Sequence, residues 1–227
     1  MSGNSEGLLV VDIGGSRMRL MLAEGGPWRE VPTGRDFRPQ DAVRQIQELA
    51  DVWRFDRIAI GCPGPVRAER VVAPPLHLGP GWVGFDFAAA LGRPVRLVND
   101  ALLQAMGAWR GGRMLYLGLG TGLGAALVAE GVAVSLELGQ LPWPAGGTFE
   151  DRLGARGLAR NGREVWLSDL ARAIAIFAPA MIADEVVLGG GNARLVEPLP
   201  PGCRAGDPEA FVRSGALRLW QAEMRVL

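Results

Sequence analysis

The sequence predicts an α/β protein of two lobes with a cleft between them. A glycine turn that carries a hydroxyl residue lies between two short strands in each half of the chain, at Gly14-Gly15-Ser16 and at Gly120-Thr121-Gly122. Between these turns, an apolar strand over residues 95–98 passes directly into a helix at Asn99-Asp100. Because both halves repeat the order strand, glycine turn, strand, we expect two similar lobes.

The boundary between the lobes is expected near residues 105–113, where Gly111-Gly112 interrupts the chain. This divides the chain into an N-terminal lobe of residues 1–105 and a C-terminal lobe of residues 106–227. The last helix, at about 208–227, is a candidate to pack back on the first lobe.

The individual elements follow from apolar periodicity and from glycine and proline. The patterns predict strands at 8–11, 17–22, 57–61, 114–117, 125–128, 132–134 and 186–188, and helices at 41–55, 85–91, 150–182 and 210–224. Asp41 is a candidate cap for the first helix, and Gly92 ends the second. Glycine and proline predict a turn at Gly25-Gly26-Pro27 and a loop over residues 71–82.

Composition excludes several classes of function. The chain has 227 residues, 48% of them hydrophobic, and no apolar run reaches the length of a membrane span. The formal net charge is zero and no basic cluster stands out, so we expect neither a nucleic-acid nor a membrane partner. All 24 cationic side chains are arginine, which excludes Schiff-base chemistry and the lysine of a Walker A loop.

The N-terminus and the cysteines point to a cytoplasmic protein. Residues 1–7 are polar and lack a charged segment that leads into a long apolar one, so we expect no secretion signal. Cys62 and Cys203 cannot form a four-cysteine zinc site, and a reducing compartment disfavours a disulfide between them. Both are expected to be small apolar residues.

Asp100 is the candidate catalytic residue. It is expected at the carboxyl end of a strand and the amino end of a helix, where ligands bind in α/β proteins. Free backbone N–H groups and the helix dipole are expected to keep its carboxylate ionised at neutral pH, as a general base requires. The alternative is that Asp100 only caps the helix.

The two glycine turns are candidate phosphate-binding loops. Glycine lets backbone N–H groups approach an anion without a Cβ in the way. The alternative for each is a tight hairpin. Gly120, Gly122 and Ala125 partly fit the dinucleotide fingerprint, but the following residues read as strands and not as the required helix, which excludes a Rossmann fold.

Taken together in order, the motifs resemble the ROK family of sugar kinases, within the actin-like ATPase (ribonuclease H-like) superfamily. The pattern is most similar to that of polyphosphate/ATP glucokinases. The resemblance rests on Asp12-Ile13-Gly14-Gly15-Ser16 with Arg19, Pro63-Gly64-Pro65-Val66, Gly81-Trp82, Val98-Asn99-Asp100, residues 119–124, Glu137-Leu138-Gly139-Gln140, Glu150 with Gly154-Ala155, and Gly189-Gly190-Gly191.

The resemblance implies a kinase that transfers a phosphoryl group from ATP or polyphosphate to a hexose, with Asp100 as general base and Mg²⁺ as cofactor. The implied sugar-binding residues are Asn99, Glu137, Gln140, Glu150, Pro63, Gly64 and His77. The implied phosphate-binding residues are Gly14, Gly15, Ser16, Gly120, Thr121 and Gly122; Gly189, Gly190 and Gly191 would face the nucleotide, and Asp12 would hold Mg²⁺ through water. Arg17 and Arg19 either supply positive charge to the transferring group or form a solvated strand face. A homodimer is also implied.

Three departures from the family pattern are present. Gln140 stands where the family has histidine, and His77, the one histidine of the chain, lies near the usual place of a sugar-binding asparagine. His77 is either a ligand or a plain loop residue. Residues 141–149 contain no cysteine, so no structural zinc is expected. The alternative function is a catalytically impaired sugar- or nucleotide-binding regulator of the same fold, and we expect it to lack DNA binding because no added segment precedes Leu8.

Overall fold

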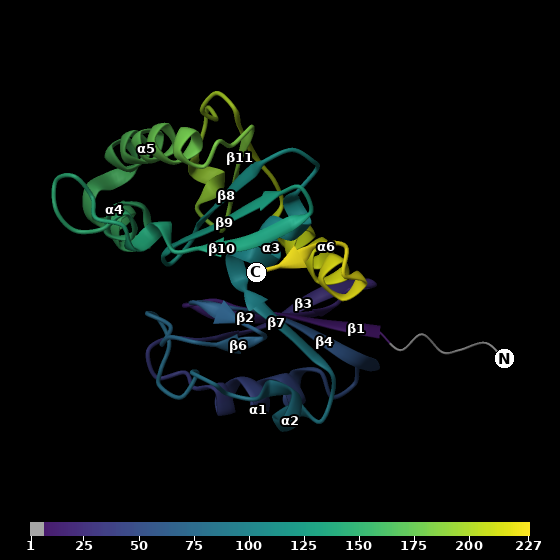
Figure 1. Ribbon diagram of the computed structural model, residues 1–227. Coiled ribbons are helices and arrows are strands. Elements are labelled where there is room, and N and C mark those ends of the chain that lie inside the picture. The colour runs from purple at the N-terminus through teal and green to yellow at the C-terminus, as the bar shows by residue number, and fades with distance from the viewer. Residues whose placement is uncertain (1–6) are drawn as a thin grey trace.

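The computed structural model describes residues 7–227 and contains one large β-sheet in each half of the chain (Figure 1). The first sheet has the strand order β3-β2-β1-β4-β7 and the second has the order β12-β11-β8-β9-β10-β13. The strands of the first sheet are β1 (Gly7–Ile13), β2 (Arg17–Leu22), β3 (Gly25–Pro32), β4 (Phe55–Cys62) and β7 (Val95–Asn99). Those of the second are β8 (Met114–Leu119), β9 (Leu123–Ala129), β10 (Val132–Leu136), β11 (Glu185–Gly189), β12 (Cys203–Ala205) and β13 (Arg225–Val226).

The two sheets share one topology. In the first, β1, β2 and β3 form an antiparallel meander, and β4 and β7 continue the sheet in parallel with β1. In the second, β8, β9 and β10 form the meander, and β11 and β12 continue it in parallel with β8. The repeat that the sequence predicts is therefore present, and it places a glycine turn between the first two strands of each sheet.

Several short or exposed strands were not expected from the sequence. Residues 25–27, interpreted as a turn, begin β3, an edge strand that tolerates Pro27 because one side of its backbone needs no partner. The hairpin β5 (Val66–Arg67) and β6 (Arg70–Val71) and the strands β12 and β13 are also additional. With only two or three residues each, β5, β6, β12 and β13 carry too little periodicity to be recognised.

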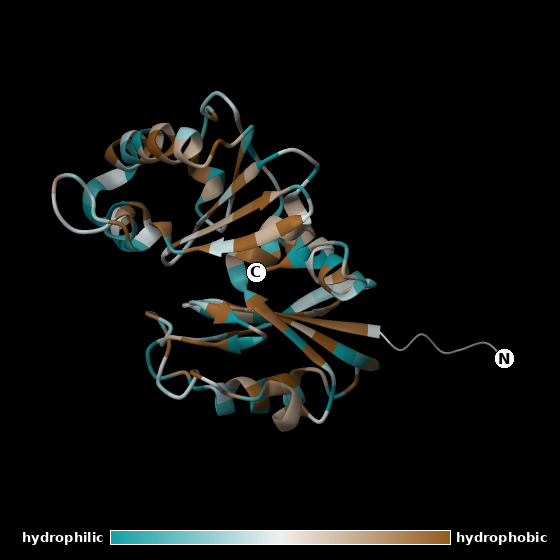
Figure 2. Cartoon of the chain, in the orientation of Figure 1, coloured by the Kyte–Doolittle hydropathy of each residue, from teal (hydrophilic) through white to brown (hydrophobic). Residues whose placement is uncertain are grey.

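Helices cover the outer face of each sheet. In Figure 1, α1 (Pro39–Leu49) and α2 (Phe87–Leu91) lie on the side of the first sheet that faces away from the second. The second sheet is covered by α4 (Phe149–Leu153) and α5 (Ala155–Ala180), which has a break at Gly162, together with the 3₁₀ turns η1 (Leu138–Gln140) and η2 (Ala193–Leu195). Figure 2 shows hydrophobic residues concentrated along the strands, in agreement with their burial.

The predicted helix at 41–55 needs correction at both ends. It begins at Pro39 after Arg38, the N-cap residue, and Asp41 lies one turn inside, where its carboxylate accepts a hydrogen bond from Arg38 N at 3.0 Å. It ends at Leu49 because the chain enters β4 at Phe55. Gly92 ends α2 in the left-handed conformation, as expected.

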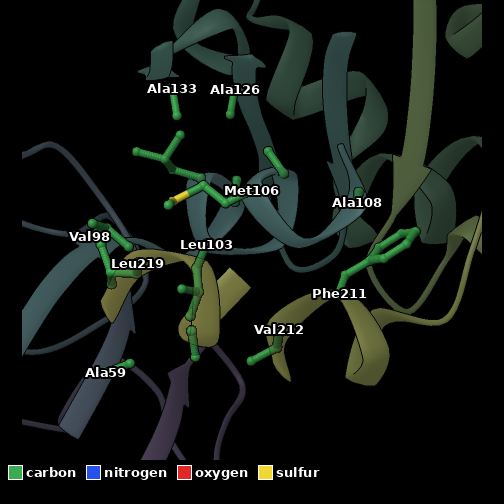
Figure 3. Packing of buried hydrophobic residues seen from close by; sticks show 14 of the residues in the cluster. Ala59, Val98, Leu103, Met106, Ala108, Ala126, Ala133, Phe211, Val212 and Leu219 are labelled. Atoms are coloured by element: carbon green, nitrogen blue, oxygen red, sulfur yellow. The ribbon is translucent and has the colours of Figure 1, made fainter. Parts of the chain in front are cut away.

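The space between the sheets is filled by α3 (Asp100–Ala108) and α6 (Pro208–Gln221), which pack against each other. A Cβ at Gly107 would overlap the carbonyl of Phe211, and one at Gly215 would overlap that of Leu103, so both glycines are needed for this close approach. The core around the two helices draws residues from both sheets, among them Ala59 and Ala126 (Figure 3).

Both helices connect the two halves of the chain. The boundary expected after residue 105 falls inside α3, and α6 contacts the first half through Arg96, which donates to the carbonyl of Leu219 at 2.7 Å. Because β1 has this helix pair on one face and α1 on the other, it is apolar at nearly every position. Within residues 7–227, no helix combines the length and apolarity that a membrane crossing requires.

Candidate functional site

A cleft of about 670 Å³ lies where the carboxyl ends of the central strands of both sheets meet. The sequence-predicted site residues that line it are Asp12, Gly14, Gly15, Ser16, Pro63, Gly64, His77, Asn99, Asp100, Gly120, Thr121, Gly122, Glu137, Gln140, Glu150, Gly190 and Gly191. Gly189 is the one candidate that does not line it. It ends β11, and its missing Cβ leaves room for the hydroxyl of Tyr116.

Asp100 is the first residue of α3 and is partly exposed to the cleft. Its carboxylate accepts a hydrogen bond from the backbone N–H of Ala101 at 2.9 Å. The helix cap is Asn99, whose side-chain oxygen accepts from Leu102 N at 3.0 Å. The helix therefore has its cap without Asp100, and the alternative that Asp100 serves as the N-cap is wrong.

The expectation that Asp100 is held ionised by the helix terminus is also wrong. Burial, followed by the charge of Asp12, raises the pKa of Asp100 to about 7. Glu137 adds to the rise, and the hydrogen bond from Ala101 only partly opposes it. Burial together with the two neighbouring carboxylates outweighs the backbone hydrogen bonds, and the resulting pKa is near the optimum for a general base at neutral pH.

Asn99 positions this segment through both ends of its side-chain amide. Besides capping α3, it donates from Nδ2 to the carbonyl of Gly64 at 3.0 Å and is buried. The side chain thus ties the loop at Pro63-Gly64 to the start of α3. These two bonds use one N–H and one lone pair of the amide, and the second N–H remains for a ligand.

The two glycine turns face each other across the cleft. Ser16 Oγ and Thr121 Oγ1 lie 2.8 Å apart, although the residues belong to opposite halves of the chain. Each turn is closed by its own backbone: Gly14 N donates to Arg17 O at 2.9 Å, and Gly120 N donates to Gly122 O at 3.1 Å. The hairpin interpretation and the phosphate-loop interpretation are compatible, because the hairpins themselves bring the hydroxyls together.

Asp12 ends in the cleft beside a cation. It is buried in β1, and Arg19 Nη2 lies 3.3 Å from its Oδ2. Burial raises the pKa of Asp12, and Arg19 partly opposes this rise. Both Arg17 and Arg19 line the cleft. Arg19 also stacks over the ring of Trp28, and Arg17 pairs with exposed Glu30 at 3.3 Å.

The carboxylates of the cleft suit Mg²⁺, an ion that takes few protein ligands, better than a metal that needs a full set of protein ligands. Among residues 7–227, no group of three or more His, Cys, Asp or Glu side chains could hold a metal. Mg²⁺ is usually bound by one or two carboxylates and completes its shell with phosphate oxygens and water. The carboxylate of Asp12, which lines the cleft, fits that mode.

His77 and Glu150 meet at the cleft from opposite halves of the chain. His77 Nε2 lies 3.0 Å from Glu150 Oε1, while Glu150 Oε2 accepts from Leu123 N at 3.2 Å. The contact requires Gly122, because a Cβ there would lie 3.1 Å from His77 Nε2 and overlap the Glu150 carboxylate. Glu137 and Gln140 lie on the same side of the cleft and are exposed. Partial desolvation of the carboxylate by the walls of the cleft, followed by the charge of Glu150, raises the pKa of Glu137.

Three polar residues that line the cleft were not predicted from the sequence. Gln104, Asn192 and Arg194 all line it. Gln104 follows Asp100 by one helical turn, so helical spacing from Asp100 is the signal that could have found it. Asn192 and Arg194 follow the glycines after β11 and carried no pattern of their own.

Comparisons with known proteins place the fold. No family model matches this chain. The bifunctional enzyme NanE/NanK of Brucella melitensis is 30% identical over 164 residues, which cover 63% of this chain and 32% of that enzyme. The chain therefore spans about a third of the length of the curated relatives it matches.

Solved structures match nearly the whole chain. The inorganic polyphosphate/ATP-glucomannokinase of Arthrobacter sp. strain KM has a TM-score of 0.83 at 23% identity, with 96% of this chain and 99% of that chain covered. A ROK family glucokinase of Streptomyces griseus, in complex with glucose and AMPPNP, has a TM-score of 0.74 at 17% identity, with 95% and 99% covered. A ROK family transcriptional regulator, a homologue of the E. coli MLC protein, has a TM-score of 0.69 at 18% identity, with 98% and 80% covered. The α/β fold of the actin-like ATPase class is confirmed, and with it the resemblance to ROK proteins at the level of fold.

Proposed function

We propose that this chain, which has the fold of the ROK proteins, is a sugar kinase that transfers a phosphoryl group from ATP or polyphosphate to a hexose hydroxyl. The observation that carries the proposal is the position of Asp100, a carboxylate with a pKa of about 7, in the same cleft as two facing glycine turns. A base near neutral pKa beside an anion-binding surface is the arrangement that phosphoryl transfer to a hydroxyl requires.

In this proposal, Asp100 accepts the proton of the attacking hydroxyl. Above a pH of about 7 the carboxylate is mostly ionised and can accept it, and the carboxylic acid formed is stabilised by the same surroundings that raise its pKa. Asn99 holds the start of α3 against the Pro63-Gly64 loop, so the carboxylate is positioned before a sugar binds.

The phosphoryl donor would lie against the glycine turns. The N–H groups of Gly14 and Gly120 close the turns, so the candidates to bind phosphate oxygens are the N–H groups of Gly15 and Gly122 and the hydroxyls of Ser16 and Thr121. Asp12 would hold Mg²⁺ through water, and the ion would neutralise phosphate charge when bound. Gly190 and Gly191 line the same cleft and are the candidates for contact with a nucleotide.

The hexose would lie near Glu137, Gln140, Glu150 and His77. These side chains offer carboxylate, amide and imidazole groups at one side of the cleft, and such groups discriminate strongly for hydroxyl-bearing ligands. Because Glu150 already contacts His77 and Leu123 N, its orientation does not depend on the sugar. Pro63 and Gly64 complete this wall, and we propose that the enzyme acts as a homodimer.

The second candidate is a sugar- or nucleotide-binding regulator without turnover. It is favoured by Gln140 in place of the family's histidine and by the similarity of the fold to a ROK transcriptional regulator. Asp100 favours the enzyme, because a regulator has no need of a base with a pKa near neutrality.

A coupled kinase assay distinguishes the two candidates. Glucose, mannose, galactose and N-acetylated hexosamines are each tested with Mg²⁺ and either ATP or polyphosphate, and binding of the same sugars is measured by calorimetry. Sugar-dependent turnover that is lost in Asp100→Asn supports the kinase. Sugar binding without turnover for any donor supports the regulator, and absence of both contradicts the proposed substrate class.

A further inference from the structure

We propose that Gln104 is an additional ligand-binding residue of the cleft, whose side-chain amide donates a hydrogen bond to a phosphate oxygen of the phosphoryl donor, and that Tyr116 positions this amide. The inference rests on the proposed function, because it assumes a ligand that contains phosphate. It adds a residue that lies outside the motifs by which the site was recognised.

Gln104 and Asp100 are the two polar side chains of α3. They are one helical turn apart, so they lie on the same face, and both line the cleft. The remaining positions of α3 other than Gly107 are buried and apolar: Ala101, Leu102, Leu103, Ala105, Met106 and Ala108. A glutamine in this series is the only amide that the helix presents to the cleft.

Tyr116 holds the Gln104 side chain in one orientation. The Tyr116 hydroxyl donates a hydrogen bond to Gln104 Oε1 at 2.7 Å, from a side chain that is completely buried in β8. Burial, then the charges of Asp100 and Asp12, raise the pKa of Tyr116 well above its usual value, so the hydroxyl keeps its proton and remains the donor. The Gln104 oxygen is thereby used, and no hydrogen bond joins its Nε2 to another of the residues at 7–227.

The surroundings of this pair lie on the phosphate side of the cleft. The Tyr116 ring packs below Gly118, where a Cβ would lie 3.3 Å from Cε1, and its hydroxyl occupies the space that a Cβ of Gly189 would need. Gly118 lies on β8 just before the turn at Gly120, and Gly189 ends β11 just before Gly190. Tyr116 therefore packs beside the glycines proposed to contact the phosphates and the nucleotide.

The ligand proposed for this position is anionic, because the amide offers N–H donors beside the glycines at the ends of β8 and β11. The carboxylates of Asp12 and Asp100 line the same cleft and repel an anion. A phosphate chain brought next to them needs N–H donors, and a hydrogen bond from an amide to a charged oxygen is stronger than one between neutral groups. The sugar-side carboxylates, by contrast, come from the end of β10 and from α4.

The key variant is the double substitution Gln104→Met with Tyr116→Phe. It removes both partners of the buried hydrogen bond, so no unsatisfied hydroxyl remains to destabilise the fold. Tyr116→Phe alone keeps the amide but releases its anchor. For both variants and for the wild type, the dissociation constants of Mg²⁺-ATP and Mg²⁺-tripolyphosphate, the KM values for donor and hexose, and the thermal midpoint are measured.

The double variant should bind at least one of the two donors about ten- to a hundredfold more weakly, as expected for the loss of a hydrogen bond to a charged group. Its KM for hexose and its thermal midpoint should stay close to those of the wild type. Tyr116→Phe should show a smaller loss, about two- to tenfold, because the amide is present but less well oriented. If the double variant does not fold, Gln104→Glu, which keeps the acceptor for Tyr116, should show the donor defect instead.

Donor binding by the variants at wild-type strength overturns the inference, as does a wild type that binds neither donor. A double variant that loses hexose and donor binding equally also overturns it, since that pattern indicates a structural role. The proposed function fails separately: a wild type that phosphorylates no sugar, but whose ATP or tripolyphosphate binding depends on Gln104, contradicts the kinase and leaves this inference standing. The reverse result, normal kinase activity in the double variant, contradicts only the inference.

Discussion

The hydroxyl oxygens of Ser16 and Thr121 lie 2.8 Å apart, and 105 positions of the sequence separate the two residues. The contact joins the two glycine turns, which follow strands of different sheets. It also means that a ligand inserted between the two turns would exchange this hydrogen bond for bonds to its own oxygens.

Removal of either hydroxyl should therefore weaken binding of the phosphoryl donor more than binding of the sugar. We expect Ser16→Ala and Thr121→Ala each to raise the KM for the donor about two- to tenfold, the usual effect of one lost neutral hydrogen bond of about 0.5–1.5 kcal/mol. Thr121→Ser, which keeps the hydroxyl, is the matched control and should stay near the wild type. Equal effects of Thr121→Ser and Thr121→Ala would contradict a role for the hydroxyl.

Replacement of the proposed base should abolish most of the turnover and leave sugar binding largely intact. For Asp100→Asn we expect kcat to fall by a factor on the order of 10² to 10⁴, which is what general bases contribute. Steady-state kinetics and calorimetry with the sugar separate the two effects. Asp86→Asn is the control, because Asp86 caps α2 by accepting from Ala89 N and lies outside the cleft. Unchanged turnover in Asp100→Asn would contradict a catalytic role.

The raised pKa of Asp100 predicts opposite pH dependences for activity and stability. The folded-state pKa is about 7 and the ordinary value is 3.8, so between these values the folded protein holds a proton that the unfolded chain has lost. The free energy of unfolding should therefore fall as pH rises from about 4 to about 7. Over the same range kcat/KM should increase as the base ionises, and level off above pH 7.

Thermal unfolding and kinetics across this pH range test both slopes. Asp100→Asn carries no titrating group at this position, so its stability should fall less steeply with pH than that of the wild type. Identical stability slopes for the two proteins would show that Asp100 does not have a raised pKa.

Gln140 is expected to set a weak or shifted sugar preference. It is exposed in the cleft and three positions from Glu137, where it can form hydrogen bonds but cannot reproduce the geometry of imidazole. Gln140→His should tighten binding of glucose, or of whichever hexose is the substrate, by about two- to tenfold, the value of one good hydrogen bond. Calorimetric titration of both proteins with glucose and its epimers measures this, with Leu141→Ala, an exposed neighbour that does not line the cleft, as control. Binding of no hexose by either protein would contradict the proposed substrate class.

Local sequence was sufficient for the repeated strand and glycine-turn order and for the position of Asp100. These features depend on residues close together in the chain: apolar runs make strands, glycine lets the backbone turn beside an anion, and a strand that runs into helix formers places the next polar residue at a strand end. The same local patterns predicted that α2 stops at Gly92, as it does.

Only the tertiary structure decided the chemistry within the cleft. The pKa of Asp100 depends on burial and on Asp12 and Glu137, which are distant in sequence. It is raised, whereas the helix end alone predicts a lowered pKa. The contact of His77 with Glu150 and the bond from Tyr116 to Gln104 likewise join elements of different halves or layers. Charge interaction and burial act through space, so their outcome depends on how α3 and α6 hold the two sheets together. Propensity and periodicity act along the chain, which is why they could predict the strands and turns but not the environment of the side chains they carry.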